Sequence, residues 1–330
     1  MDITRFGNTG LKVSRLCLGT MTFGLQCDEA TSFAICDRAA EGGINFIDTA
    51  DAYPLGGDRS TAGRTEEIVG KWLAGRREDF ILATKLCSPM GPKPWNRGLS
   101  RKHVFEAIEG SLRRLKTDYV DLYQLHHRDA DTPMDETLRA LDDLVRAGKV
   151  RYLGVSNHPA WWVARSLGRS ELHGLARFDC VQPRYNLLFR QMERSMLPMC
   201  ESEGLAVIPY NPLAGGLLTG KHRRADPPPE GTRFTLGSAA KNYTERYWQE
   251  REFDTVERLR AVADEAGMPL ARMAIAWVLA NPVITAPIIG ASRVEQLDDS
   301  LAAVEVALSK ELKASLDELT AEYRHGDAPR

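Results

Sequence analysis

Short apolar runs alternate with longer amphipathic stretches along most of this 330-residue chain. Such runs, bounded by turn residues, are typical of strands that are buried on both faces of a parallel sheet. Each is followed by a stretch whose apolar residues recur with the period of a helix. The predicted strands are 15–18, 44–47, 80–84, 119–125, 150–155, 179–182, 205–209 and 285–289. The predicted helices are 29–41, 64–75, 101–115, 133–147, 159–168, 190–204, 253–266, 270–280, 293–304 and 308–323.

This alternation predicts an α/β chain that closes into a parallel (β/α)8 TIM barrel, with residues 1–330 as a single domain. An open doubly wound sheet is the alternative architecture. It is disfavoured because no two glycines in the sequence are separated by a single residue, so the G-x-G-x-x-G fingerprint of dinucleotide-binding sheets is missing.

Three segments fall outside the repeating units. Residues 1–14 predict a hairpin that caps the barrel, because Gly7-Asn8-Thr9-Gly10 is a turn sequence between two short runs. Residues 221–250 follow the seventh strand and are too long and too aromatic for an ordinary connection. We expect a lid or binding loop there, with a disordered excursion as the alternative. Residues 305–330 predict a C-terminal helix and tail.

Composition narrows the classes of function. A formal net charge of -2 gives no electrostatic reason to expect nucleic acid or an anionic membrane as a partner. No segment reaches the roughly 20 apolar residues of a membrane span, and the first residues lack a signal-peptide apolar core, so we expect a cytoplasmic protein. The six cysteines and the histidines are scattered, which indicates neither a disulfide framework nor a metal site. The pattern leaves the oligomeric state open.

Ionisable residues follow three consecutive predicted strands. Asp48, Lys85 and His126 each come directly after an apolar run, and Tyr53 lies in the turn-prone segment after Asp48. Reactive groups of a (β/α)8 barrel gather at the C-terminal ends of its strands, so we expect these four side chains to meet. Strand alternation directs His126 into the barrel mouth and its neighbour His127 toward the helices.

These four side chains suit the delivery of a proton to an oxygen. A tyrosine has a pKa near ~10, so it becomes useful at neutral pH only where its surroundings favour the phenolate. Lys85 can supply the favouring charge, while Asp48 holds Lys85 in place and His126 offers a hydrogen bond to a substrate carbonyl. Each residue also has a structural interpretation, an ion pair at the rim or a packing tyrosine, and only their joint arrival favours catalysis.

A second group of polar residues, Ser156, Asn157, Gln182 and Tyr210, follows later strands. Amides and hydroxyls can satisfy a flat carboxamide, and an aromatic face can stack on a planar ring. That combination suits a nicotinamide. For Ser156 and Asn157 the structural alternative is the N-cap of the next helix.

Two further segments could contact phosphate. Residues 215–221 fit the G-x-x-x-x-G-K spacing of a phosphate-binding loop, but His222 stands where that motif requires Ser or Thr, so we reject the motif. Its glycines could still offer backbone N–H groups to a pyrophosphate. Gly290-Ala291-Ser292-Arg293 opens a predicted helix with a hydroxyl and a guanidinium, which suits a phosphate monoester.

At these residues the chain resembles the aldo/keto reductase superfamily, along nearly its whole length. No single stretch is specific, but the combination is. The matching stretches are Arg5-Phe6-Gly7, Leu18-Gly19-Thr20-Met21, Phe46-Ile47-Asp48-Thr49-Ala50-Asp51-Ala52-Tyr53, Ala83-Thr84-Lys85, Asp121-Leu122-Tyr123-Gln124-Leu125-His126, Gly154-Val155-Ser156-Asn157, Val181-Gln182-Pro183-Arg184-Tyr185-Asn186, Tyr210-Asn211-Pro212-Leu213 and Gly290-Ala291-Ser292-Arg293 with Gln296.

The resemblance implies a barrel that binds NADP(H), in preference to NAD(H), without a Rossmann domain. It makes Tyr53 the general acid and base, supported by Asp48, Lys85 and His126. It assigns the carboxamide to the polar group Ser156, Asn157 and Gln182, with Tyr210 stacked on the ring. The other residues expected at the cofactor are Thr20, Met21, Pro212, Leu213, Ala214, Gly216, Lys221, Arg233, Gly290, Ser292, Arg293, Gln296 and Asp299. Ser300 departs from the family pattern, in which an asparagine usually contacts adenine.

We therefore expect an NADPH-dependent oxidoreductase that reduces an aldehyde or ketone, a small-molecule carbonyl substrate, with Tyr53 as the proton donor. Side chains that follow strand ends are expected at the substrate: Phe23, Leu55, Trp95 and Arg128. The alternative is an NADP(H)-binding redox-sensing or regulatory subunit similar to the potassium-channel β subunits. The sequence begins directly at the predicted hairpin, from which we expect the enzyme.

Overall fold

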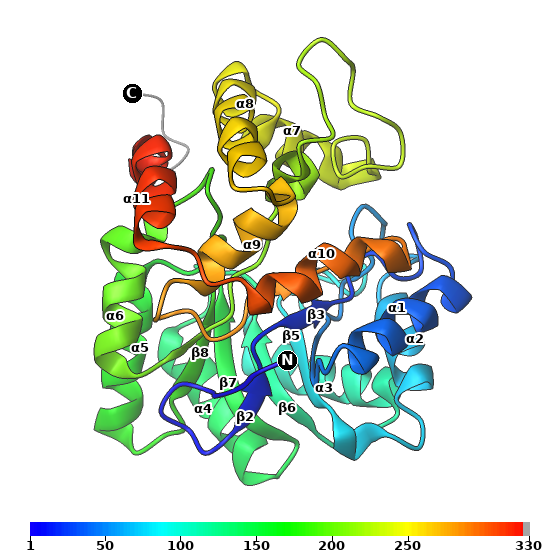
Figure 1. Cartoon of the computed structure of the whole chain (residues 1–330). Helices are drawn as coiled ribbons and strands as arrows, with labels where there is room; N and C mark the ends of the chain where they lie inside the picture. The colour runs from blue at the N-terminus through cyan, green and yellow to red at the C-terminus, as the bar shows by residue number, and fades with distance from the viewer. Residues whose placement is uncertain (326–330) are drawn as a thin grey trace.

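The structure, a computed structural model, describes residues 1–325 and is built around a barrel of parallel strands (Figure 1). The eight strands lie in the order β10-β3-β4-β5-β6-β7-β8-β9. Ile288 N donates a hydrogen bond to Pro209 O at 2.8 Å, and Tyr210 pairs with Ile288, so the two ends of this order meet. The predicted TIM-barrel fold is confirmed. The strands are β3 (Cys17–Gly19), β4 (Phe46–Asp48), β5 (Ile81–Leu86), β6 (Val120–Leu125), β7 (Val150–Ser156), β8 (Phe178–Gln182), β9 (Ala206–Val207) and β10 (Ile288–Ile289).

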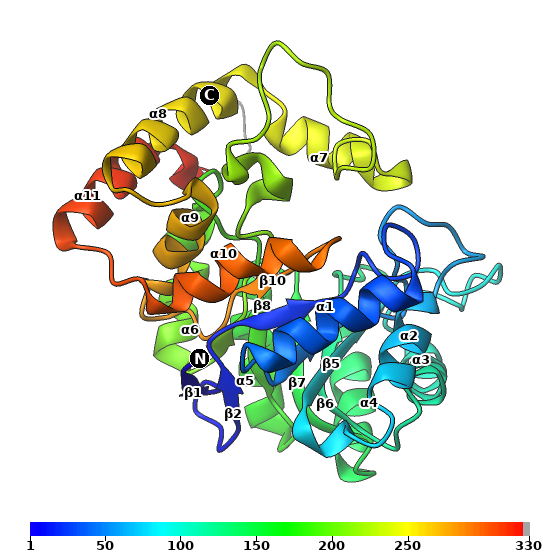
Figure 2. The ribbon, with the colours of Figure 1, turned by 45° about the vertical axis from the view of Figure 1, so that its right-hand side comes forward.

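Helices surround the barrel and connect successive strands (Figures 1 and 2). Two of them, α1 (Glu29–Glu41) and α3 (Arg101–Leu115), have the predicted bounds, and each begins after a capping side chain, Asp28 and Ser100. The others are α2 (Arg64–Trp72), α4 (Met134–Arg146), α5 (Ala160–His173), α6 (Met196–Glu203), α7 (Ala240–Tyr247), α8 (Glu250–Glu265), α9 (Leu270–Leu279), α10 (Leu297–Ala302) and α11 (Lys310–Leu319).

Three predicted helices are interrupted in the structure. The helix predicted at 190–204 consists of a 3-10 turn, η2 (Gln191–Arg194), and α6, because Ser195 between them is not helical, with φ -145°. The other two are likewise split, into η5 (Val294–Gln296), α10 and η6 (Ala303–Glu305), and into α11 and η7 (Ala321–His325). Of the predicted C-terminal segment, residues 326–330 lie outside the described residues.

The predicted N-terminal hairpin is present, and it covers the N-terminal end of the barrel. Strands β1 (Ile3–Arg5) and β2 (Lys12–Ser14) pair in antiparallel fashion. Between them Phe6 is fully buried inside the barrel, with its ring edge-on to Phe46 at 5.8 Å. Gly7 has φ +54°, and a Cβ there would lie 2.6 Å from the backbone N of Ala206, so the hairpin can approach the barrel only with glycine at this position.

The segment after β9 is more structured than the loop predicted at 221–250. It contains η4 (Gly237–Ala239) and α7, and it follows a further 3-10 turn, η3 (Ala214–Thr219). An aromatic cluster supports it, because the Phe234 ring lies 4.6 Å from Trp248 and 5.4 Å from His222. The segment reaches across the barrel mouth, where Gln26 Nε2 donates to Gly231 O at 2.7 Å (α7 in Figure 2).

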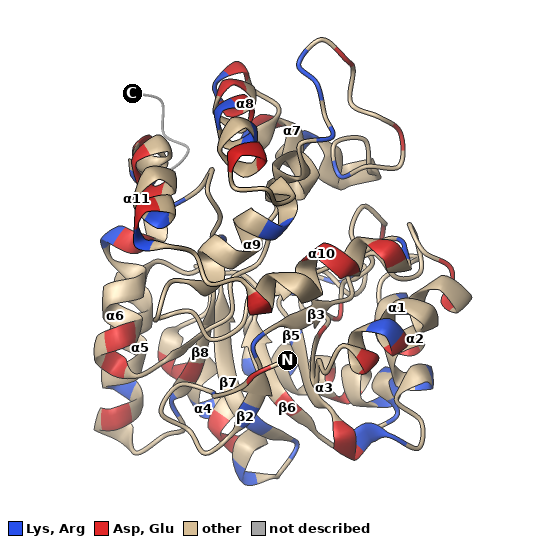
Figure 3. Cartoon of the chain, in the orientation of Figure 1, with Lys and Arg blue, Asp and Glu red and all other residues tan. Residues whose placement is uncertain are grey.

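The outer surface carries both signs of charge, which Figure 3 shows distributed over the outer helices. Within residues 1–325, none of the helices combines the length and the apolar character needed to span a membrane. The same residues contain no group of three or more His, Cys, Asp or Glu side chains that could hold a metal ion.

Candidate active site

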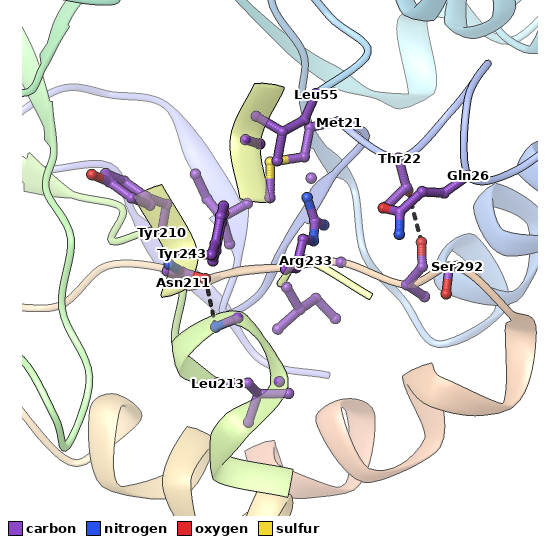
Figure 4. A pocket seen from close by; sticks show the side chains of 18 of the residues that line it. Met21, Thr22, Gln26, Leu55, Tyr210, Asn211, Leu213, Arg233, Tyr243 and Ser292 are labelled. Carbon is purple, nitrogen blue, oxygen red and sulfur yellow. Dashed lines mark hydrogen bonds between the residues drawn. The ribbon is translucent and has the colours of Figure 1, made fainter. Parts of the chain in front are cut away.

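A pocket of about 980 Å³ opens at the C-terminal ends of the strands. One wall consists of strand ends and the loops that follow them, and the other consists of η3, α7 and the segment between them. Figure 4 shows side chains of both walls, among them Met21 and Tyr243. This is the end of the barrel opposite to the hairpin. The predicted catalytic residues Asp48, Tyr53 and His126 line this pocket, whereas Lys85 lies behind them with no exposed surface.

Lys85 joins Asp48 to Tyr53. Its Nζ donates to Asp48 Oδ2 at 2.5 Å and to Tyr53 Oη at 3.4 Å. The third proton goes to Thr49 O at 2.9 Å, so the ammonium is fully satisfied although it is buried. Burial alone would lower the pKa of Lys85, but the adjacent Asp48 and the Tyr53 phenol outweigh burial and raise it to about 12. Lys85 therefore stays charged.

Asp48 is fixed from its other side by two amides. Gln124 Nε2 and Gln182 Nε2 both donate to Asp48 Oδ1 at 2.9 Å, and Gln182 Nε2 also donates to Gln124 Oε1 at 3.1 Å. The two amides come from β6 and β8, so they reach Asp48 on β4 across the inside of the barrel. A buried carboxylate with an ammonium on one oxygen and two amides on the other keeps its orientation. Gln124 was not among the residues predicted from the sequence.

Tyr53 is a neutral phenol at physiological pH. Burial raises its pKa above the ordinary value of 10.0, and the opposing effect of Lys85 only reduces that rise. The sequence predicted that the Lys85 ammonium would favour the phenolate. The pKa of Tyr53 nevertheless moves upward, because desolvation is the larger effect. The phenol in the pocket therefore carries a proton that it can donate.

His126 lies edge-on to Tyr53, with ring centroids 5.8 Å apart. Burial, followed by the charges of Lys85 and His127, lowers the pKa of His126 well below 6.5, so the ring is neutral. Its Nδ1 is buried and has no hydrogen-bond partner among residues 1–325. A neutral imidazole beside the phenol can donate a hydrogen bond to a substrate oxygen but does not compete with Tyr53 as an acid.

His127 also lines the pocket, contrary to the prediction that it points toward the helices. Its ring stacks on His126 with centroids 4.4 Å apart and an angle of 9° between the planes. Strand β6 ends at Leu125, so the alternation of side chains no longer applies to the next two residues. The two imidazoles therefore face the same side.

The predicted carboxamide group forms one hydrogen-bonded chain. Tyr210 Oη donates to Asn157 Oδ1 at 2.8 Å, and Asn157 Nδ2 donates to Ser156 Oγ at 3.0 Å. Ser156 Oγ in turn donates to Gln182 O at 2.9 Å. Helix α5 begins at Ala160 and has no side-chain cap, so the alternative N-cap role for Ser156 and Asn157 is wrong. All four residues line the pocket.

The far end of the pocket holds cations for which no ion pair is found within residues 1–325. The charged groups of Lys221 and Arg293 make no hydrogen bond or ion pair within the part of the chain that the structure describes, and Arg233 Nη1 is buried without a partner there. Burial, and then the charge of Arg293, lowers the pKa of Lys221, so these two cations act on each other. Nearby, Ser292 N and Oγ both donate to Gln296 Oε1, at 2.8 and 3.3 Å. Such a cluster suits a bound anion.

The glycines of η3 do not offer free N–H groups, contrary to the possibility raised by the sequence. Gly215 N donates to Asn211 Oδ1 at 3.0 Å (dashed in Figure 4), and Gly216 N donates to Leu213 O at 2.8 Å. A phosphate at this end would therefore be bound by the side chains of Lys221, Arg233 and Arg293. The other predicted cofactor residues that line the pocket are Thr20, Met21, Pro212, Leu213, Gly216, Gly290, Gln296 and Asp299. Ala214 does not line it, because its side chain is fully buried in the core.

The predicted substrate residues are mostly placed elsewhere. Leu55 lines the pocket, whereas Phe23 is fully buried in the core. Trp95 and Arg128 do not line the pocket; Trp95 is 47% exposed, and Arg128 stacks over Trp161. Following a strand end in sequence is therefore a weak guide, because the long loops turn their side chains in several directions.

The sequence predicted a lid or binding loop at 221–250 but not which of its side chains reach the pocket. Asn242, Tyr243 and Arg246 of α7 line the pocket at the spacing of one helix face, and Ala239 of η4 lines it just before them. The signal was present as the aromatic residues of 221–250, but the polar composition of that interval concealed a helix of eight residues.

Comparison with known proteins identifies a family and several relatives along nearly the whole chain. Residues 15–321 match the model of the "Aldo/keto reductase family". The chain is 43% identical to "Uncharacterized oxidoreductase YrpG" of Bacillus subtilis, over 97% of this chain and 96% of that protein. It is 37% identical to "Norsolorinic acid reductase stcV" of Emericella nidulans, over 92% and 77% of the two chains. It is 36% identical to "Probable voltage-gated potassium channel subunit beta" of Arabidopsis thaliana, over 93% and 92%.

Proposed function

Because the chain belongs to the aldo/keto reductase family, a family of oxidoreductases that generally uses nicotinamide cofactors, we propose that it reduces an aldehyde or ketone to an alcohol with NADPH. The observation that carries this proposal is the contact between the buried Lys85 ammonium and the Tyr53 phenol in a pocket. The contact supports proton delivery to an oxygen, and the set of side chains around it holds neither a nucleophile with its base nor a metal cage.

In the proposed reaction Tyr53 donates its proton to the carbonyl oxygen. As the phenolate forms, Lys85 stabilises the negative charge, since its Nζ already points at Tyr53 Oη. Asp48 keeps the ammonium in place, and the neutral His126 holds the carbonyl oxygen near the phenol by a hydrogen bond. When bound, the cofactor supplies the hydride that the carbonyl carbon accepts.

The residues along the pocket fit a nicotinamide dinucleotide phosphate. The chain formed by Ser156, Asn157 and Tyr210 offers polar atoms and a ring face next to the catalytic group. Gln182 uses both amide protons on Asp48 and Gln124, and its Oε1, which has no partner within residues 1–325, can accept from a carboxamide. At the other end, the unpaired Lys221, Arg233 and Arg293 suit the pyrophosphate and a further phosphate, which supports NADP(H) over NAD(H).

The experiment that tests the proposal follows NADPH consumption across a panel of aldehydes and ketones with Tyr53→Phe. We expect kcat to fall by about 100- to 10,000-fold, the usual contribution of a positioned acid, while the Kd for NADPH stays within twofold. Tyr119→Phe is the matched control, because that tyrosine packs between Arg77 and Arg151 and does not line the pocket. Equal turnover in the wild type and Tyr53→Phe would remove Tyr53 as the donor.

The second candidate function is a redox-sensing or regulatory subunit, favoured by the similarity to the potassium channel subunit from Arabidopsis thaliana. The two functions differ in one measurement. A sensor binds NADP(H) but turns over none of the carbonyl compounds, and Tyr53→Phe then changes nothing. Steady turnover that depends on Tyr53 favours the reductase.

A further inference from the structure

Seven charged side chains line the pocket, and their balance is uneven: Asp48, Glu295 and Asp299 against Lys221, Arg233, Arg246 and Arg293. Two of the acids are engaged within the protein. Asp48 binds Lys85, and Asp299 Oδ1 accepts from Arg272 Nη2 at 3.0 Å. The lining therefore has an excess of positive charge that no carboxylate of the pocket neutralises.

Three of these cations belong to the end proposed for the cofactor phosphates. The charge of Arg293 helps to lower the pKa of Lys221, so these two cations are close together. Arg233 lies near Cys27: burial raises the pKa of the Cys27 thiol, and the charge of Arg233 reduces that rise. In Figure 4 Arg233 lies between Tyr243 and Ser292, and its guanidinium is 5.9 Å from the centre of the Tyr243 ring. The fourth cation, Arg246, is not part of this group.

Arg246 lies at the reaction end because the end of α7 is anchored there. Its neighbour Tyr247 accepts hydrogen bonds through Oη from Asn186 Nδ2 at 3.1 Å and from Asn211 Nδ2 at 3.4 Å, and Asn211 directly follows Tyr210. The electrostatic effects agree with this position. Burial, then Lys85 and then Arg246, lowers the pKa of His127, and Arg246 also partly offsets the rise that burial causes in the pKa of Tyr210.

Helix α7 turns its two faces to different surroundings. Asn242, Tyr243 and Arg246 line the pocket, whereas Lys241 and Glu245 face away and pair with each other at 3.7 Å. The one acidic residue of α7, Glu245, therefore does not lie beside Arg246 on the pocket face. Within residues 1–325, its guanidinium makes no hydrogen bond or ion pair.

A half-buried guanidinium without an anion keeps a costly, incompletely solvated charge, and a carboxylate is its preferred bidentate partner. The phosphates of the proposed cofactor have their own cations at the other end. From this geometry we infer that Arg246 binds an anionic group of the substrate, so that the preferred substrate is an aldehyde or ketone that also carries a carboxylate. The inference rests on the proposed reductase function and names its substrate class.

The test compares two aldehydes that differ in the charge of the group opposite the carbonyl: 4-carboxybenzaldehyde and its methyl ester, methyl 4-formylbenzoate. The measured quantity is the ratio of kcat/KM for the acid to kcat/KM for the ester at saturating NADPH. We expect the wild type to favour the acid, and Arg246→Gln to lower the ratio by about 10- to 100-fold, mainly through KM for the acid, as for the loss of a charge-assisted bidentate contact. Arg246→Lys should restore part of the ratio.

Lys241→Gln is the matched control, because it removes the same charge from the outer face of the same helix. We expect that variant to keep the wild-type ratio, and we expect the Kd of Arg246→Gln for NADPH, measured by fluorescence titration, to match the wild type. If the guanidinium only stabilises the C-terminal turn of α7, its removal lowers kcat/KM for both substrates equally and leaves the ratio unchanged. That result would overturn the assignment.

The failures of the two proposals are distinguishable. If the wild type reduces acid and ester equally well and Arg246→Gln has the same ratio, the anionic substrate is refuted and the reductase stands. If the wild type consumes no NADPH with either aldehyde or with the wider panel, the reductase is refuted, and the substrate assignment with it. A raised Kd for NADPH in Arg246→Gln would assign the guanidinium to the cofactor instead.

Discussion

The catalytic group and the end of the pocket proposed for the phosphates differ in how charge is satisfied. In the catalytic group, Asp48 and Lys85 are 2% and 0% exposed and satisfy each other. At the end proposed for the phosphates, Lys221 and Arg293 are exposed, and their charged groups have no partner within residues 1–325. Charges that are satisfied inside the protein hold a reacting group in place whatever is bound, whereas unpaired charges reserve their attraction for a ligand. The comparison predicts that chemistry and cofactor binding can be damaged separately.

The largest effect is expected from Lys85→Met. Loss of the ammonium leaves the phenolate of Tyr53 without a counter-charge, so kcat should fall about 1,000-fold, while the Kd for NADPH changes little. The comparison fails if NADPH binding falls as much as kcat.

The same variant leaves Asp48 as a buried carboxylate without its cation, which can cost about 3–5 kcal/mol of folding stability. The double variant Lys85→Met with Asp48→Asn removes both charges and controls for this loss. It should unfold at a higher temperature than Lys85→Met and remain inactive, and recovery of turnover in the double variant would contradict the role of Lys85.

The second-largest effect is expected from a change at the end of the pocket proposed for the phosphates. Arg293→Ala should raise the Kd for NADPH by about 10- to 100-fold and leave NADH nearly unaffected, because only the former carries the additional phosphate. At saturating NADPH, kcat should be preserved. Arg223→Ala is the control, since Arg223 is exposed on the neighbouring loop, contacts Gly220 O and Glu257, and does not line the pocket. An equal loss for NADH and NADPH would contradict the phosphate assignment.

The smallest effect, a change of kcat with pH near neutrality, needs no mutation. Burial holds the pKa of Tyr53 above 10.0, and carbonyl reduction requires the protonated phenol. At saturating NADPH, kcat for reduction should therefore be level at neutral pH and fall about tenfold per pH unit only above that pKa. Alcohol oxidation requires the phenolate, so its rate should rise with pH below that pKa and level off above it. A reduction rate that declines already between pH 7 and pH 9, roughly, would show that another group titrates.

The strand ends of the site follow directly from the sequence. Asp48 and Lys85 each end an apolar run, and parallel pairing of β4 with β5 brings them together without further information. The fold follows from the same alternation of runs. Local pattern is sufficient wherever a residue belongs to a strand, because the barrel fixes where each strand ends.

Residues beyond the strand ends could not be placed in this way. His127 stacks on His126 because β6 has ended, and Phe23 turns into the core rather than the pocket. The position of α7 depends on contacts distant in sequence, such as Tyr247 with Asn186. A short polar helix gains its stability from such packing rather than from its own propensity, so its pattern alone does not reveal it.

The hairpin at the opposite end of the barrel has a kinetic consequence. Phe6 and its neighbours fill the barrel at that end, so the candidate site can be reached only from the C-terminal ends of the strands. If the proposed cofactor and substrate bind one above the other there, the lower ligand has to bind first and leave last. We would then expect an ordered mechanism of binding and release, which product-inhibition patterns can detect. The cause would be the N-terminal hairpin, which closes the other end of the barrel.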